Sequence, residues 1–396
     1  MLKLFFDLRD LFRAPRLAFS LQRMWIQLVG LSVGFVGYLV FTYAGFLTAG
    51  FDLAGSWARY GLCPCFFATG ETFPWYSWIL AAVAILFLLF VFLIANTAVA
   101  RATYMLAKGN NFYTWRESYA FAFRKAGSVL LTPVSLAVLI GMVIVGALIL
   151  GLLGKIPYAG ELGISLFTAV WFFAALLLFF FAVILLVSII LVPSIIATTD
   201  EDAFEAVFQT FSLTWSQPWR LVIYEGVITL LSLFAMGLFA FAAKEAFIIM
   251  NALLSSFMGG DYINLMTNGQ AMVQSWLLMI QNVVQSIYGD ATPWIYFRHE
   301  FIPIPASELP LTVVISSYLY GLSLLFIMGW VLSYGVSTFT AGNTLLYVIL
   351  RKKKDDENLL ERVDKEEEEE EEETEGEAGT EGEEKAPEDE KSESEE

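Results

Sequence analysis

The sequence predicts an all-α protein: a polytopic transmembrane helical bundle of about six spans, followed by a disordered, acidic C-terminal tail. Three observations lead to this prediction. Hydrophobic residues make up 57% of the 396 positions and charged residues only 16%, whereas charged residues approach about a quarter of a soluble domain. Six apolar stretches are long enough to cross a bilayer, and Lys and Arg collect in alternate connections between these stretches.

The net charge of −17 belongs to one end of the chain. Residues 355–396 contain 24 Asp and Glu against 4 Lys and Arg and carry −20, whereas residues 1–354 contain 19 bases against 16 acids and carry +3. A segment so poor in apolar residues cannot bury enough surface to fold. We therefore expect a basic stop cluster and a disordered polyacidic tail over residues 351–396, attached to a mildly basic membrane domain over residues 1–350.

A helix needs roughly 20 apolar residues to cross about 30 Å of hydrocarbon. Six stretches meet this requirement: 24–50, 75–106, 128–153, 161–197, 221–243 and 311–350. The first stretch is too long for the hydrophobic region of a signal peptide and lacks a convincing cleavage site, so we interpret it as a retained span. Gly30 and Gly34 within it have the spacing that allows close helix packing.

The last stretch is unusually long, since 40 helical residues extend about 60 Å. Gly329 and Gly335 bracket the place where we expect a bend. We keep this stretch as one span, because dividing it would export the basic cluster at residues 351–354.

Basic residues fix the expected orientation, because short loops rich in Lys and Arg stay on the cytoplasmic side. With the N-terminus inside, the cytoplasmic segments contain 15 Lys and Arg and the outer loops contain four. This asymmetry predicts six spans with both termini in the cytoplasm. We expect the bacterial cytoplasmic membrane to be the location.

Short segments with helical periodicity precede the first, third and fifth spans and predict interfacial helices on the cytoplasmic side. Their apolar stripes are, in chain order, Leu4, Leu8, Leu11 and Phe12, ended by Pro15; Phe112, Trp115, Tyr119, Ala122 and Phe123; and Phe204, Val207, Phe208, Phe211 and Trp215. The chain thus divides into three units of one orientation, residues 1–106, 107–197 and 198–350. The helices either lie on the inner leaflet and bind anionic lipid or a partner, or pack against the cytoplasmic end of the bundle.

Two of these helices have candidate capping boxes at their starts. The pairs are Thr114 with Glu117 and Thr198 with Glu201, the arrangement in which a hydroxyl and a carboxylate satisfy the first free amides of a helix.

One family resemblance rests on the stretch DEDAFEAVFQTFSLTWSQPWRLVIYEG, Asp200 to Gly226. It has an acidic opening, a helix with Ala206 and Ser212, and then Trp219 leading into a span; residues 109–131 are similar in style. These features resemble the membrane domain that is fused to some glycerophosphodiester phosphodiesterases and also occurs as stand-alone six-span bacterial proteins. The resemblance covers residues 100–243. It implies a six-span bundle of undefined function, because in the fused proteins catalysis belongs to a separate soluble domain.

Ionisable residues inside spans are the usual sign of an ion path or proton relay, and few occur here. Glu225, about one turn inside the fifth span, is the acidic candidate, and we expect it either to pair with Arg220 or to bind a cation. Asn96 and Arg101 lie near the inner end of the second span, where we expect Arg101 to extend to the interface.

The region 244–310 is predicted to form an outer cap, with one apolar helix face from Trp276 to Ile287. The loop after it contains Asp290, Arg298, His299 and Glu300. Acid–base chemistry there is one interpretation, and an aromatic interfacial belt with a surface ion pair is the other. The chain has one histidine and no metal-ligand spacing, so we expect no metal and no cofactor.

Cys63 and Cys65 flank Pro64, and a disulfide between them would close only a small, strained ring. Thiolates suit a soft metal, and in an oxidising compartment the two thiols could oxidise instead. The sequence leaves these alternatives open.

Arg351, Lys352, Lys353 and Lys354 follow the last span and are candidates for contact with an anionic membrane surface. The acidic tail beyond them is held off that surface by repulsion, recruits a basic protein partner, or only adds a solvated chain; the sequence leaves these three alternatives open. No basic nucleic-acid patch, phosphate-binding glycine loop or nucleophile elbow occurs. Whether the chain forms a homo-oligomer stays open.

These observations favour a non-enzymatic membrane protein with an organising, scaffolding or accessory role in the bacterial envelope, interacting with lipids or partner proteins. The alternative is a transporter or channel for an apolar or amphipathic solute. A third hypothesis is an intramembrane lipid-modifying enzyme that uses the loop around His299.

Overall fold

The computed structural model describes residues 2–66, 72–277, 303 and 308–362. All regular elements in these ranges are helices, and six helices are long and apolar enough to cross a membrane. These six are α3 (Leu21–Thr48), α5 (Trp75–Lys108), α7 (Ala126–Leu153), α9 (Thr168–Thr199), α11 (Pro218–Met258) and α14 (Leu311–Asp355). The predicted fold class is therefore confirmed; the polyacidic tail beyond residue 362 lies outside the described residues.

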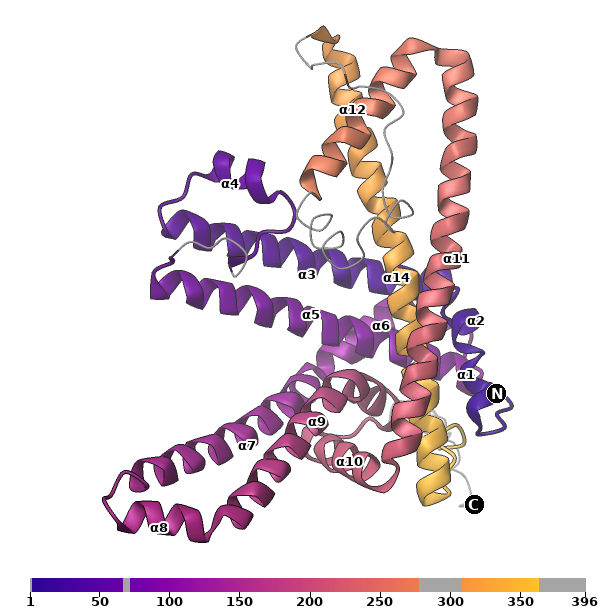
Figure 1. The fold of residues 1–396 in the computed structure, drawn as a ribbon. Coiled ribbons are helices and arrows are strands. Elements are labelled where there is room, and N and C mark those ends of the chain that lie inside the picture. Colours follow the sequence, from indigo (N-terminus) through magenta and orange to yellow (C-terminus); the bar gives the residue numbers. More distant parts are fainter. Residues whose placement is uncertain (1, 67–71, 278–302, 304–307, 363–396) are drawn as a thin grey trace, which may run out of the picture.

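The six long helices form three hairpins, α3 with α5, α7 with α9, and α11 with α14, which splay away from a common meeting point (Figure 1). Shorter helices precede the hairpins near this point: α1 (Leu8–Leu11), α2 (Ala14–Ala18), α6 (Trp115–Arg124) and α10 (Ala203–Ser216). At the far ends, α4 (Leu53–Tyr60) and α8 (Ala159–Leu166) connect the first two pairs. The helix α12 (Gly260–Trp276) turns back along α14.

The hydrophobic core lies where the hairpins meet. Its main cluster is built from residues 93–107 of α5, 191–197 of α9 and 345–350 of α14, with side chains of α1, α6, α10 and α11 packed around them. We call the end of the molecule where the hairpins meet the core end. Outside it, most apolar side chains of the long helices are exposed. Exposed apolar side chains are suited to contact with lipid. The helices can lie in lipid because each helix satisfies its own backbone hydrogen bonds.

The helix α11 is longer than the sequence predicted. The predicted span ended at residue 243, but α11 continues without a break to Met258. Residues 246–258 carry no charge and include several Ala, Leu and Met, which are good helix formers, so nothing ends the helix. The region first interpreted as an outer cap therefore begins with 15 more residues of α11 and continues as α12; the predicted helix face between residues 278 and 287 lies outside the described residues.

The helix α14 is also continuous, and its 45 residues extend about 68 Å. The expected bend at Gly329 and Gly335 does not interrupt it. The two glycines instead admit neighbouring helices: a Cβ on Gly335 would lie 2.8 Å from the sulfur of Met236, and one on Gly329 would lie 3.0 Å from Leu28. Their role is close packing, as it is at Gly30, where an added Cβ would overlap the Cβ of Ala95 on α5.

The cap of α6 is confirmed and that of α10 differs from the prediction. Thr114 accepts a hydrogen bond from the Glu117 amide at 3.3 Å, and the Glu117 carboxylate accepts one from the Thr114 amide at 2.7 Å. In α10 the cap is Asp202, not Thr198. Thr198 still belongs to α9, which continues to Thr199. Its hydroxyl donates to the Ser194 carbonyl one turn earlier.

The prediction for Pro15 is also wrong. Pro15 does not end the first short helix; it lies in the first turn of α2, where a missing amide hydrogen costs nothing.

Candidate functional site

Small polar side chains fill the part of α14 that lies in the core. Ser333, Ser337, Thr338, Thr340 and Thr344 are all buried. Ser333 and Thr338 each donate to the carbonyl of the preceding turn, at Trp330 and Tyr334, at 2.8 Å, and such bonds satisfy a hydroxyl without a partner on another helix. These residues keep α14 thin where other helices approach it.

Polar contacts also connect α14 to one other helix of each hairpin, namely α5, α9 and α11. Thr340 donates to the Asn96 side chain of α5 at 3.1 Å, and Thr344 lies 3.4 Å from the Ser194 hydroxyl of α9. With its amide nitrogen turned toward α11, Asn343 donates to both carboxylate oxygens of Glu225, at 2.7 and 3.2 Å. We call these six residues the polar seam: Glu225, Asn343, Thr340, Asn96, Thr344 and Ser194.

The polar seam is the main candidate site inside the predicted membrane layer. Asn343 is only 1% exposed, and Glu225 is half-buried. An amide that donates twice to one carboxylate is a strong, charge-assisted contact when the carboxylate is ionised. The arrangement can hold four helices, α5, α9, α11 and α14, in register, or it can bind a proton or a small cation at Glu225.

The expected pair of Glu225 with Arg220 is absent among the ion pairs of the described residues. Arg220 donates instead to the Gln217 side chain at 3.3 Å. The reason is helix geometry: residues five apart do not lie on one face. The sequence identified Glu225 correctly as an isolated acid but could not identify its partner, which is 118 positions away.

The sequence predicted that Arg101 extends to the interface, and this prediction is wrong. Arg101 is fully buried. Its guanidinium donates to the Ala197 carbonyl of α9 at 3.1 Å and lies over the Phe121 ring of α6, 4.3 Å from the centroid. A buried charge is costly unless it is paired or hydrogen-bonded. Arg101 therefore acts as a structural cation that joins α5, α6 and α9.

The basic cluster at the end of α14 is paired with acids of the chain itself. Arg351 contacts Asp355 and Glu357 at 3.0 and 2.9 Å. The lysines continue the pattern: Lys352 with Asp356 at 2.8 Å, Lys353 with Asp7 at 2.8 Å and Lys354 with Asp355 at 3.7 Å. The four bases thus face four acids, which leaves little net charge there for a membrane surface; lipid contact at this cluster stays a prediction.

The ion pair between Lys353 and Asp7 also fixes the two described ends of the chain beside each other. The hydrogen bond from Lys353, and then its charge, hold the pKa of Asp7 below its usual value. A hydrogen bond from Lys352 likewise lowers the pKa of Asp356. Both carboxylates are therefore ionised at neutral pH.

Two other predicted sites are not brought together by the structure. Asp290, Arg298, His299 and Glu300 lie outside the described residues. Cys63 and Cys65 are both free thiols, partly buried beyond α4. No group of three or more His, Cys, Asp and Glu side chains in the described ranges could hold a metal ion.

The short helices α6 and α10 turn much of their predicted apolar stripes outward. On α10, Phe204 is 80% exposed and Trp215 is 76% exposed, while Ala206 and Thr210 face the core. Trp215 meets Phe180 of α9 edge-on, with ring centroids 5.5 Å apart. The outward aromatic side chains therefore continue the exposed apolar surface of the long helices rather than filling the core.

Comparison with protein-family models, with curated proteins and with solved structures found no match. The resemblance of residues 100–243 to the membrane domain of glycerophosphodiester phosphodiesterases therefore stays a prediction.

Proposed function

We propose that this chain is a non-enzymatic integral membrane protein that organises lipids or partner proteins in the bacterial cytoplasmic membrane, with both termini in the cytoplasm. One observation carries the proposal: at the core end, aromatic side chains of α6 and α10 point away from the protein. The side chains in question are Phe123 of α6 and Phe204, Phe208 and Trp215 of α10, and Phe112, just before α6, is exposed as well.

Position supports a lipid-facing role for these side chains. The helix α10 follows α9 and precedes α11, and α6 lies between α5 and α7, so both helices lie at the ends of candidate spans. A helix that lies flat at this level places its aromatic face in the boundary between headgroups and acyl chains. Trp219 and Val222 at the start of α11 are exposed apolar side chains as well.

The test compares the outward face of α10 with an aromatic pair at the far end of the first hairpin. One variant replaces Phe204, Phe208 and Trp215 by Ser; the control replaces the exposed Trp75 and Tyr76 by Ser. Each protein is extracted in native membrane discs, and the retained lipids and proteins are identified by mass spectrometry. We expect the wild type and the control to retain the same lipids or partners and the triple variant to lose them.

Two results would contradict the proposal. One is a wild type that retains neither a specific lipid nor a reproducible partner. The other is a triple variant that retains the same set as the wild type.

The polar seam supports a second candidate function, transport of an apolar or amphipathic solute, because Glu225 is an ionisable group held inside a candidate span. Solute flux into vesicles that contain the purified protein tests this idea, with Glu225→Gln as the variant. A transporter that uses this carboxylate loses flux in the variant. Absence of flux for every lipid-like and small polar solute in the wild type rejects transport.

A further inference from the structure

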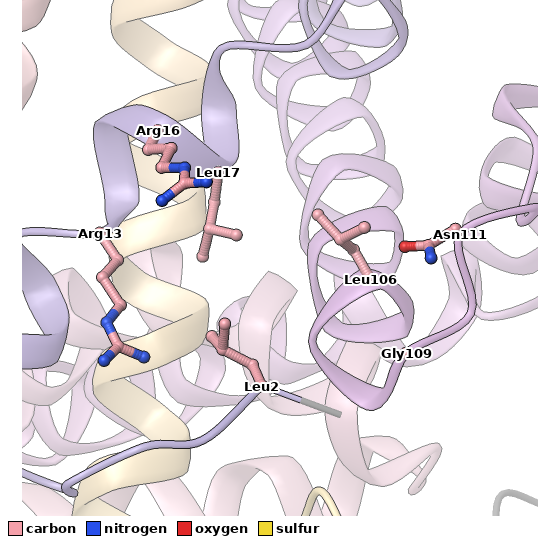
Figure 2. Close-up of a pocket in the computed structure, with 7 residues that line it drawn as sticks. All are labelled: Leu2, Arg13, Arg16, Leu17, Leu106, Gly109 and Asn111. Carbon is pink, nitrogen blue, oxygen red and sulfur yellow. The ribbon is translucent and has the colours of Figure 1, made fainter.

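A hollow of about 600 Å³ lies between α2 and the end of α5, with two arginines on one side and an amide on the other. Figure 2 shows Arg13 and Arg16 on one wall, and Leu106 and Asn111 across from them. Leu2 and Leu17 lie between these walls. The lining therefore combines cationic groups, one neutral polar group and an apolar floor.

The position of the hollow matches the depth of lipid headgroups. Arg16 lies five residues before α3 begins, and Gly109 ends α5 with a left-handed conformation at φ 109°. The hollow thus lies beside the start of α3 and the end of α5, which are on the same side of the first hairpin. Phe19 and Leu21, beside it in sequence, are exposed apolar residues that belong in acyl chains. With the predicted spans in a bilayer, a ligand in the hollow lies at the level where phosphate groups meet hydrocarbon.

The charges of the lining favour a single negative charge. Arg13 is partly compensated, because its Nε lies 3.6 Å from the Asp10 carboxylate and its guanidinium donates to the Lys3 carbonyl at 2.6 Å. Arg16 is exposed and makes no ion pair within the described part of the chain. Asp7, the other nearby acid, is paired with Lys353. One uncompensated guanidinium with a planar set of donors suits a phosphate oxygen pair.

We infer that this hollow binds the phosphate of an anionic phospholipid, with Arg16 as the main contact, Asn111 as a second donor, and the acyl chains over Leu2, Leu17 and Leu106. This site rests on the proposed function, to which it adds one defined lipid class. The same phosphate chemistry also occurs in free phosphate. The three leucines favour the lipid, since a hydrated ion gains nothing from an apolar floor.

The test uses the full chain, stripped of lipid in a neutral detergent, with binding measured by native mass spectrometry. Three ligands are added separately: phosphatidylglycerol, phosphatidylcholine and inorganic phosphate. We expect the anionic lipid to bind more tightly than the other two. Arg16→Gln is expected to weaken it at least about tenfold, as loss of a charge-assisted contact does. Arg116→Gln, which removes an exposed cation of α6 outside the hollow, is the matched control and leaves binding unchanged.

A second variant examines the apolar floor. Leu17→Glu places a carboxylate beside Arg16 and is expected to abolish binding of phosphatidylglycerol. Arg16→Gln changes an exposed position, and we expect its thermal unfolding to equal that of the wild type. Equal binding of phosphatidylglycerol by the wild type and by Arg16→Gln overturns the site. Binding of inorganic phosphate as tight as that of the lipid overturns the lipid assignment. Because the lipid is added to purified protein, failure of the membrane-disc experiment does not alter this result.

Discussion

Two buried tyrosines in the core differ in one hydrogen bond. The Tyr104 hydroxyl donates to the Leu359 carbonyl at 2.7 Å, which fixes the segment after α14 against α5. The Tyr347 hydroxyl is equally buried but has no hydrogen-bond partner in the described part of the chain. A buried hydroxyl without a partner costs free energy, whereas a paired one contributes about 1 kcal/mol to stability.

These hydroxyls give opposite expectations for the same substitution. Tyr104→Phe is expected to lower the free energy of unfolding by about 1 kcal/mol, because the Leu359 carbonyl loses its donor. Tyr347→Phe is expected to leave stability unchanged or raise it. Thermal unfolding of both variants in detergent measures the difference, and an equal loss in the two variants would refute this explanation.

Cys63 provides a prediction about pH. Burial raises the pKa of its thiol to about 11, because a low-dielectric surrounding disfavours the thiolate, which is the reactive form. In a Cys65→Ser background, the rate of maleimide labelling at Cys63 is therefore expected to rise about tenfold for each pH unit from 7 to 10. An unperturbed thiol instead levels off above about pH 8.5. A rate that reaches its plateau near pH 9 would contradict the raised pKa.

Single residues that matter were visible in the sequence, but their partners were not. Glu225 and Arg101 were both recognised as ionisable groups in apolar runs. Their contacts, Asn343 and the Ala197 carbonyl, lie about a hundred positions away. Periodicity along one helix describes the faces of that helix and contains no information about which helix packs there.

At the scale of helices, glycines set how closely α3 and α5 approach. Gly30→Ala places a methyl group where the Ala95 side chain already lies, and overpacking of this kind typically costs 1–3 kcal/mol. Gly141→Ala is the matched control, because nothing lies within 4 Å of the added Cβ in α7. The control is expected to be stable or slightly more stable, since Ala favours helix over Gly. Unfolding temperatures that fall equally in both variants would exclude the packing explanation.

The short helices show why helix position was predictable and orientation was not. The start of α6 follows from its cap, because the Thr114 capping box is formed as expected, whereas α10 is capped by Asp202 and not by the predicted Thr198. The direction of the apolar stripe of α10 depends on its surroundings. In water an apolar stripe must face the core, but beside lipid it is equally stable facing outward. Small residues such as Ala206 and Thr210 then make the closer contact with neighbouring helices.

For the whole molecule, the helix order places the connections at two ends. Residues 109–114, 200–202 and 356–362 lie near the meeting point of the hairpins, and residues 154–158 lie at a far end (Figure 1). In a background without Cys63 and Cys65, we expect Lys155→Cys to react with an impermeant maleimide on intact cells. Asn110→Cys and Glu361→Cys are expected to react only after the membrane is opened. Labelling of Glu361→Cys on intact cells would contradict the orientation that the basic residues predict.

The helix α14 lies at the centre of the molecule but is synthesised last of the six long helices. This helix contacts α2, α3, α5, α9, α11 and α12, yet its residues are the last of the six long helices to leave the ribosome. Until then Asn96, Ser194 and Glu225 have no α14 residue to meet, and polar groups of this kind are costly in lipid. The core can therefore close only once α14 is in the membrane, and we expect the insertion machinery or a membrane chaperone to shield these groups until then.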